Sequence, residues 1–83
     1  MYPNTPNPFK GETVFGFSLP EAASATLTVT DVTVKVLRII KGEYARGYHE
    51  INLNSAQLPA TGVLYYTLKT GDYTATRKMV ILQ

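Results

Sequence analysis

The stretch that decides the fold runs from Thr61 to Leu82 and reads TGVLYYTLKTGDYTATRKMVIL. Two runs rich in β-branched and aromatic residues flank the pair Gly71-Asp72, a pattern typical of two antiparallel strands joined by a tight turn. Because successive side chains of a strand point to opposite faces, one face of this hairpin is expected to be buried. The residues of that face are Leu64, Tyr66, Leu68, Ala75, Met79 and Ile81. An isolated hairpin is marginally stable in water, so the rest of the chain must supply a second layer.

Alternation of apolar and polar residues predicts further short strands before this hairpin, at residues 13–19, 24–30 and 48–53. The positions expected to face the core are Phe15, Phe17, Leu19, Ala25, Leu27, Val29, Ile51 and Leu53, with His49 at the edge. Residues 41–47 are expected to form a loop. Asn54 and Ser55 are expected to cap a single helical turn that Pro59 ends.

About six or seven short strands with closely spaced turn signals predict an all-β domain, a small antiparallel two-sheet sandwich of immunoglobulin-like or fibronectin-like type. A small closed barrel is the alternative. The sandwich is expected to occupy residues 12–83. Residues 1–11 hold three prolines and predict a stiff, extended lead-in, in which Phe9 closes one end of the core.

Composition excludes several classes of function. The formal net charge of +2 is small and the lysines are scattered, so nucleic acid is not expected as a partner. The chain has no cysteine, which excludes a disulfide scaffold, a thiolate metal site and a cysteine nucleophile. Crossing a bilayer takes about 20 consecutive apolar residues, and no apolar run in the chain approaches that length. The first residues do not read as a signal peptide, so an exported domain of this kind is expected to be part of a longer chain.

The sequence shows no arrangement of residues suited to catalysis. His49, the single histidine, alternates with Ile51 and Leu53 and is expected at the edge of the core rather than in a catalytic role. The six acidic residues stand singly, without the spacing of an EF-hand or of an acid–base pair. The isolated glycines form no phosphate-binding loop. We therefore expect a non-catalytic domain without metal or cofactor.

Three tyrosines of the hairpin, Tyr65, Tyr66 and Tyr73, could form a binding face for sugars or for a protein. Ordinary strand packing, with Tyr66 directed inward and Tyr65 outward, is the simpler expectation.

Eight stretches, spread over nearly the whole chain, also resemble a known family in sequence. They are Asn4–Phe9, Phe17–Ala22, Leu27–Val29, Asp31–Thr33, Lys35–Leu37, Gly47-Tyr48, Thr61–Leu68 and Lys78–Leu82. In order and spacing these stretches resemble the type A C-terminal sorting domain of proteins that Bacteroidetes-type bacteria export through the type IX secretion system. The Asn-Pro-Phe lead-in is a weak signal alone, and becomes specific together with the Gly-Val-Leu-Tyr-Tyr strand and the basic-apolar ending.

The resemblance implies a folded signal fused behind an N-terminal cargo. The cargo would enter the periplasm, the outer-membrane translocon would recognise the sorting domain, and a sortase-like peptidase would typically remove it. The cargo would then reach the cell surface or the medium. The implied recognition residues are Gly62, Val63, Leu64, Tyr65, Tyr66, Lys78, Met79, Val80, Ile81 and Leu82.

Docking at a strand edge or on a sheet face would suit such recognition. Cleavage would fall upstream of the domain or in its proline-rich lead-in, where the backbone is accessible. Two other hypotheses about the function remain open. One is an adhesive or carbohydrate-binding immunoglobulin-like module, and the other is a structural module such as that of flagellar hook-capping proteins, whose lead-in is similar.

The same resemblance singles out Val34. The family's turn reads Asp-Val-Thr-Gly-Lys, and Val34 stands at the glycine position. Glycine adopts the left-handed conformation at little cost, whereas a β-branched residue there costs about 1–3 kcal/mol. Either the turn is held under strain, or residues 24–40 straighten into one strand and the domain exchanges halves with a second copy through the 31–35 hinge.

Overall fold

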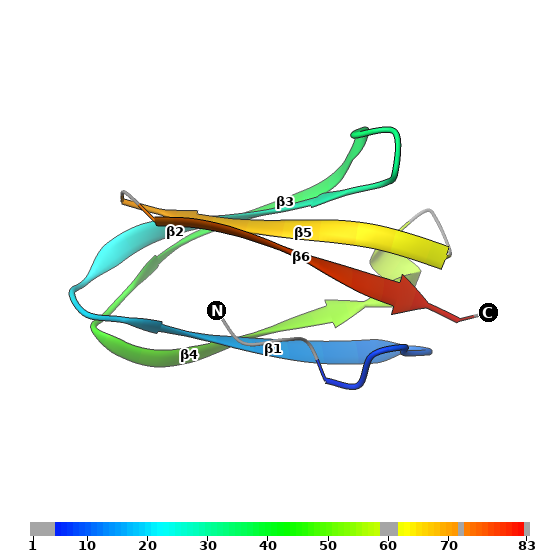
Figure 1. Ribbon diagram of the computed structural model, residues 1–83. Coiled ribbons are helices and arrows are strands. Elements are labelled where there is room, and N and C mark those ends of the chain that lie inside the picture. Colours follow the sequence, from blue (N-terminus) through cyan, green and yellow to red (C-terminus); the bar gives the residue numbers. More distant parts are fainter. Residues whose placement is uncertain (1–4, 59–61, 72, 83) are drawn as a thin grey trace.

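The computed structural model describes residues 5–58, 62–71 and 73–82. Within them the chain forms six antiparallel strands in two sheets that pack face to face (Figure 1). The strands are β1 (Glu12–Leu19), β2 (Ala23–Thr30), β3 (Val36–Tyr44), β4 (Gly47–Asn54), β5 (Gly62–Thr70) and β6 (Tyr73–Ile81). One sheet pairs β1 with β4, and the other has the order β3-β2-β5-β6. The predicted all-β, two-sheet antiparallel sandwich is confirmed, in place of a closed barrel.

The core lies between the inner faces of the two sheets. Its buried apolar side chains are Phe9, Phe15, Phe17, Leu19, Ala25, Leu27, Val29, Ile51, Leu53, Leu58, Leu64, Tyr66, Leu68, Met79 and Ile81. Tyr66 joins the two layers, since its ring centroid lies 5.0 Å from that of Phe15 on the opposite sheet. Alternation predicted the buried strand positions among them correctly, whereas Ala75 is only half-buried and the burial of Leu58 was not predicted.

The C-terminal hairpin pairs as predicted, from Gly62 opposite Ile81 to Thr70 opposite Tyr73. Gly71 opens its turn with φ of +53°, in the left-handed region that glycine adopts without strain. Asp72, the second predicted turn residue, lies outside the described residues.

The prediction of a loop at residues 41–47 is wrong for most of that range. β3 continues to Tyr44, and only Ala45 and Arg46 separate it from β4. The reason is tertiary, because β2 offers a pairing partner as far as Ala23 opposite Tyr44. The Tyr44 ring also packs edge-on against Phe17, with 5.1 Å between ring centroids.

The connection between β2 and β3 forms a closed turn. β2 ends at Thr30 and β3 begins at Val36, so residues 24–40 do not form one continuous strand. Val34 has φ of +67° and thus occupies the left-handed region. Of the two forms considered for this segment, the structure has the strained turn.

The lead-in from Thr5 onward is packed against both sheets. Thr5 pairs with Val14 of β1 through two backbone hydrogen bonds of 2.7 and 3.0 Å. Phe9 forms a parallel bridge with Ile81 of β6, and its buried ring fills the core as expected. The lead-in therefore connects the two layers of the sandwich.

A single 3-10 turn, Ser55–Gln57, follows β4. Its N-cap is Asn54, whose side chain accepts a hydrogen bond of 2.8 Å from the Ala56 amide, as the sequence predicted. Pro59, the predicted end of this turn, lies outside the described residues. In the described parts of the chain, no helix has the length and apolar character that crossing a membrane requires.

Candidate functional site

Strand alternation divides eight of the ten residues of the resemblance into two sets. Four of them, Leu64, Tyr66, Met79 and Ile81, point into the core and are fully buried. Val63, Tyr65, Lys78 and Val80 point to the outer face of the four-stranded sheet. Gly62 begins β5 with φ of +92°, and Leu82 follows β6 and is half exposed. A partner could reach the outward set and Leu82, whereas the inward set holds the hairpin in place.

The register brings the outward set together. Val63 lies opposite Val80, and Tyr65 lies opposite Lys78. Directly opposed residues of an antiparallel pair have Cβ atoms about 4.5–5.5 Å apart, so these four side chains form one continuous surface. We call it the outer hairpin patch. Its apolar members remain accessible, with 38% of Val63 and 37% of Tyr65 exposed.

The patch continues onto the neighbouring strands. Tyr65 is opposite Thr30 of β2, and Thr30 is opposite Val36 of β3, which is half exposed. A row of four residues therefore crosses the sheet from an edge valine to Lys78. An aromatic ring beside aliphatic side chains and a single cation is suited to contact with another protein, because aromatic residues are enriched in protein interfaces.

The backbone edge of β6 beside this patch is occupied by the lead-in. The Asn7 side chain donates to the Lys78 carbonyl at 3.3 Å and accepts from the Val80 amide at 2.9 Å. The Phe9 amide donates to the Val80 carbonyl at 2.9 Å, and the Leu82 amide donates to the Phe9 carbonyl at 2.7 Å. A partner strand could pair with this edge only by displacing Asn7 and Phe9, whereas the sheet face is open.

The opposite edge of the same sheet is β3, which pairs only with β2 among the described strands. Val36 and Ile39 on this strand are about half exposed. Unpaired edge strands with apolar side chains are ready templates for further pairing. The sheet thus has one edge covered by the lead-in and one edge open.

The three hairpin tyrosines do not form a common face. Tyr66 is completely buried, Tyr65 belongs to the outer hairpin patch, and Tyr73 lies at the other end of the hairpin on the inward-facing side of β6. The expected packing of Tyr66 inward and Tyr65 outward is confirmed.

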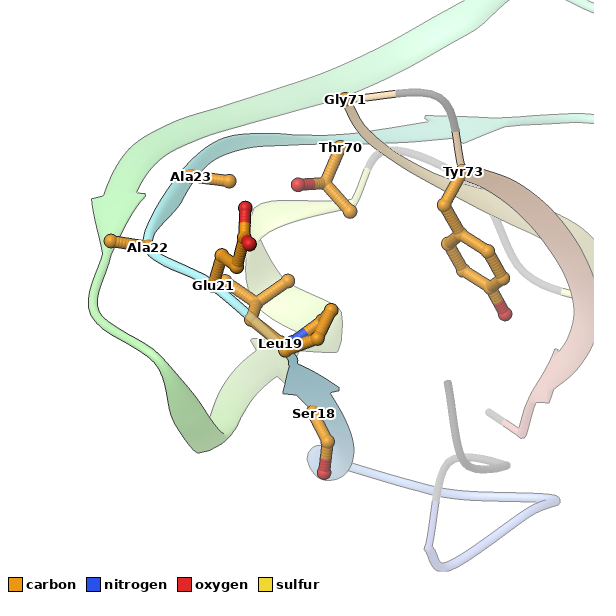
Figure 2. A pocket seen from close by; sticks show the side chains of 9 residues that line it. Ser18, Leu19, Glu21, Ala22, Ala23, Thr70, Gly71 and Tyr73 are labelled. Atoms are coloured by element: carbon orange, nitrogen blue, oxygen red, sulfur yellow. The ribbon is translucent and has the colours of Figure 1, made fainter.

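A pocket of about 660 Å³ opens beside Tyr73 (Figure 2). It is lined by Ser18, Leu19, Pro20, Glu21, Ala22, Ala23, Thr70, Gly71 and Tyr73. Figure 2 shows the Glu21 carboxylate and the Thr70 hydroxyl directed toward each other, and the Tyr73 ring on the side of Thr70 away from Glu21. Sequence reasoning missed this pocket, because two turns far apart in the chain build it and neither carries a signal by itself.

His49 lies at the edge of the core, where the alternation placed it. Its ring packs against Tyr44 and Phe17, with ring centroids 5.1 and 5.6 Å away. Its Nε2 lies 2.7 Å from the Ala45 carbonyl oxygen and donates to it in the tautomer protonated at that nitrogen. In the part of the chain that the structure describes, no three His, Cys, Asp or Glu side chains gather as metal ligands would.

Sequence reasoning also missed the role of Asn7, whose side chain bonds to β6 from 73 residues away in the chain. The available signal was its place in the Asn-Pro-Phe stretch, which resembles the family without indicating what the asparagine contacts.

Comparison of the chain with models of protein families, with curated proteins and with solved structures finds no match. The resemblance to a sorting domain therefore rests on the stretches quoted for it.

Proposed function

We propose that this domain is a folded export signal, a C-terminal sorting domain that directs a larger cargo across the outer membrane through the type IX secretion system. One observation carries the proposal. Three stretches of the resemblance that are far apart in the chain, Asn7–Phe9, Gly62–Tyr66 and Lys78–Leu82, are hydrogen-bonded neighbours in the fold. A signal that the translocon reads on a folded domain needs such a composite surface.

In this proposal the translocon contacts the outer hairpin patch face-on. Tyr65 is suited to be the central anchor, because large aromatic side chains contribute most to protein interfaces. Lys78 beside it would select an acidic partner surface and steer association. The buried residues Leu64, Tyr66, Met79 and Ile81 would act indirectly, by holding the hairpin in the conformation that is read.

Processing by a sortase-like peptidase is then expected upstream of Thr5. A peptidase needs extended, accessible backbone, and the lead-in is tied to both sheets by backbone hydrogen bonds at Thr5 and Phe9. The domain would pass through the periplasm with its cargo and reach the cell surface or medium. It would carry out no chemistry of its own.

The decisive experiment fuses residues 2–83 behind a signal peptide and a reporter in a host with an active type IX system. We expect the reporter outside the cell, and a reporter retained in the periplasm with a folded domain contradicts the proposal. Lys78→Ala should reduce export without changing the melting temperature, because the residue is exposed. Lys69→Ala is the matched control, since Lys69 is an exposed lysine of the same sheet face outside the patch.

An adhesive or carbohydrate-binding module is the second candidate, and the pocket beside Tyr73 is the observation in its favour. An exposed ring with carboxylate and hydroxyl groups nearby is suited to binding a sugar. Oligosaccharides that shift the NMR signals of Glu21 and Thr70 in the wild type, and not in Tyr73→Ala, would support this candidate. An export defect in Lys78→Ala without such binding would decide for the sorting function.

A further inference from the structure

The turn between β2 and β3 combines backbone strain with a largely exposed side chain at Val34. Val34 has φ of +67°, a conformation that β-branched residues strongly disfavour. The side chain is 77% exposed, so burial does not offset the strain. Figure 1 shows this turn projecting at one end of the four-stranded sheet.

One carboxylate holds the turn closed. Oδ1 of Asp31 accepts hydrogen bonds from the Thr33 amide at 2.8 Å, the Thr33 hydroxyl at 2.6 Å and the Lys35 amide at 3.1 Å. Two backbone hydrogen bonds add to these, from the Val34 amide to the Asp31 carbonyl and from the Asp31 amide to the Lys35 carbonyl. The hydrogen bond from the Thr33 hydroxyl is the main reason that the pKa of Asp31 is lowered.

The residues flanking Val34 favour the extended form. Val32 and Val36 are 66% and 50% exposed, and both are β-branched. In the closed turn these side chains gain little from packing. A straight segment would remove the strain at Val34 and let the valines face another strand.

A straight segment does not fit inside one molecule. Residues 24–40 would span roughly 55 Å at about 3.3 Å per residue. The longest dimension of the domain is 37 Å. The two ends of such a strand would therefore belong to different sandwiches.

The topology permits this exchange without loss of pairing. The turn separates a first part, containing the lead-in, β1 and β2, from a second part containing β3 to β6. The pairings between the parts are β1 with β4, β2 with β3, β2 with β5, and Phe9 with Ile81. A second copy can supply every one of them, so that only residues 31–35 change conformation.

We propose that the partner of this turn is a second copy of the chain, which exchanges lead-in, β1 and β2 across a straightened 31–35 hinge. The two hinges then run antiparallel beside each other, and Val32 and Val34 of one copy face those of the other. This self-association does not depend on the sorting function. It adds an interaction surface at the end of β2, next to the open edge of β3.

The test refolds the 83-residue chain over a range of concentrations and measures its mass by light scattering. We expect a dimer that increases with protein concentration. Val34→Gly should raise the dimer dissociation constant at least about tenfold, because glycine relieves the strain in the monomer and each dimer contains two hinges. Asp31→Ala should shift the distribution toward dimer, because it removes the hydrogen bonds that hold the turn.

A disulfide distinguishes exchange from simple edge pairing. Ser24 and Glu43 lie opposite each other on β2 and β3, and their side chains are hydrogen-bonded. The chain has no other cysteine, so in the double variant Ser24→Cys, Glu43→Cys this is the one cysteine pair that lies adjacent within a sandwich. After oxidation, an exchanged dimer is covalent on a non-reducing gel, whereas a dimer paired through β3 edges runs as a monomer.

Three results would overturn the proposal. The first is that the wild type and Asp31→Ala are both monomeric at every concentration. The second is that Val34→Gly forms a dimer as stable as that of the wild type. The third is that the double-cysteine variant forms a dimer whose disulfides close within each chain.

Discussion

Tyr65 and Tyr66 are adjacent in the sequence and differ completely in their surroundings. Tyr66 is fully buried against Phe15, whereas Tyr65 lies on the outer face opposite Lys78. The alternation of a strand is enough to place one ring in the core and to leave the other accessible. This contrast allows single substitutions to separate fold from function in the hairpin.

We predict that Tyr66→Ala lowers the free energy of unfolding by about 3–5 kcal/mol, the range for deleting a large buried ring. Tyr65→Ala should change it by less than about 1 kcal/mol and should still reduce export. Denaturant unfolding and the reporter fusion measure the two effects. A Tyr65→Ala domain that is stable and fully exported would remove this residue from the recognised surface.

At Asp31 the prediction concerns pH. Its pKa is lowered from the ordinary value of 3.8, chiefly by the hydrogen bond from the Thr33 hydroxyl. Hydrogen bonds from the amides of Lys35 and Thr33 and the charge of Lys35 lower the pKa further, whereas desolvation of the carboxylate raises it. The carboxylate therefore stabilises the turn fully above about pH 3.8, and this contribution is lost as the pH falls through the lowered value. In an NMR titration, the amides of Thr33 and Lys35 should shift with a midpoint below 3.8. Asp31→Asn should abolish that transition, and a midpoint at or above 3.8 would contradict the hydrogen-bonded turn.

At the scale of elements, β6 serves the core, the outer hairpin patch and the lead-in at once. Met79 and Ile81 are buried, Lys78 and Val80 belong to the patch, and the backbone of Lys78 and Val80 binds Asn7. Its last residues therefore cannot be removed without disturbing all three.

We predict that deletion of residues 78–83 abolishes export and also destabilises the fold. Met79 and Ile81 are each worth about 1.5–3 kcal/mol when fully buried, a large share of the stability of a small domain. The melting temperature and the export of the reporter are measured in parallel. A deletion variant that melts like the wild type would mean that the inward face of β6 contributes little to the core.

For the molecule as a whole, the lead-in covers one side of the sandwich and contacts both sheets. It pairs with β1 at Thr5 and with β6 at Phe9, so its backbone is hydrogen-bonded to both sheets. The Phe9 ring is buried between them. From Thr5 onward, the proline-rich lead-in is thus part of the structural unit.

We predict that Phe9→Ala lowers the free energy of unfolding by about 3–5 kcal/mol. Lys10→Ala, at the adjacent exposed position, is the control and should change it by no more than about 0.5 kcal/mol. Urea unfolding followed by tyrosine fluorescence measures both. Equal stability of the two variants would show that the lead-in does not contribute to the core.

The sequence alone determined most of the buried strand positions, where the hairpin turns and where one helical turn follows β4. These features depend on alternation along a strand, on Gly71 and on the cap at Asn54, all of which are local. Only the tertiary structure decided that β3 extends to Tyr44, that Asn7 and Phe9 cover the edge of β6, and that two distant turns enclose a pocket. Each of these depends on pairing between segments far apart in the chain. No local pattern encodes such pairing, because backbone hydrogen-bonding groups are the same at nearly every residue and the partner strand selects among them.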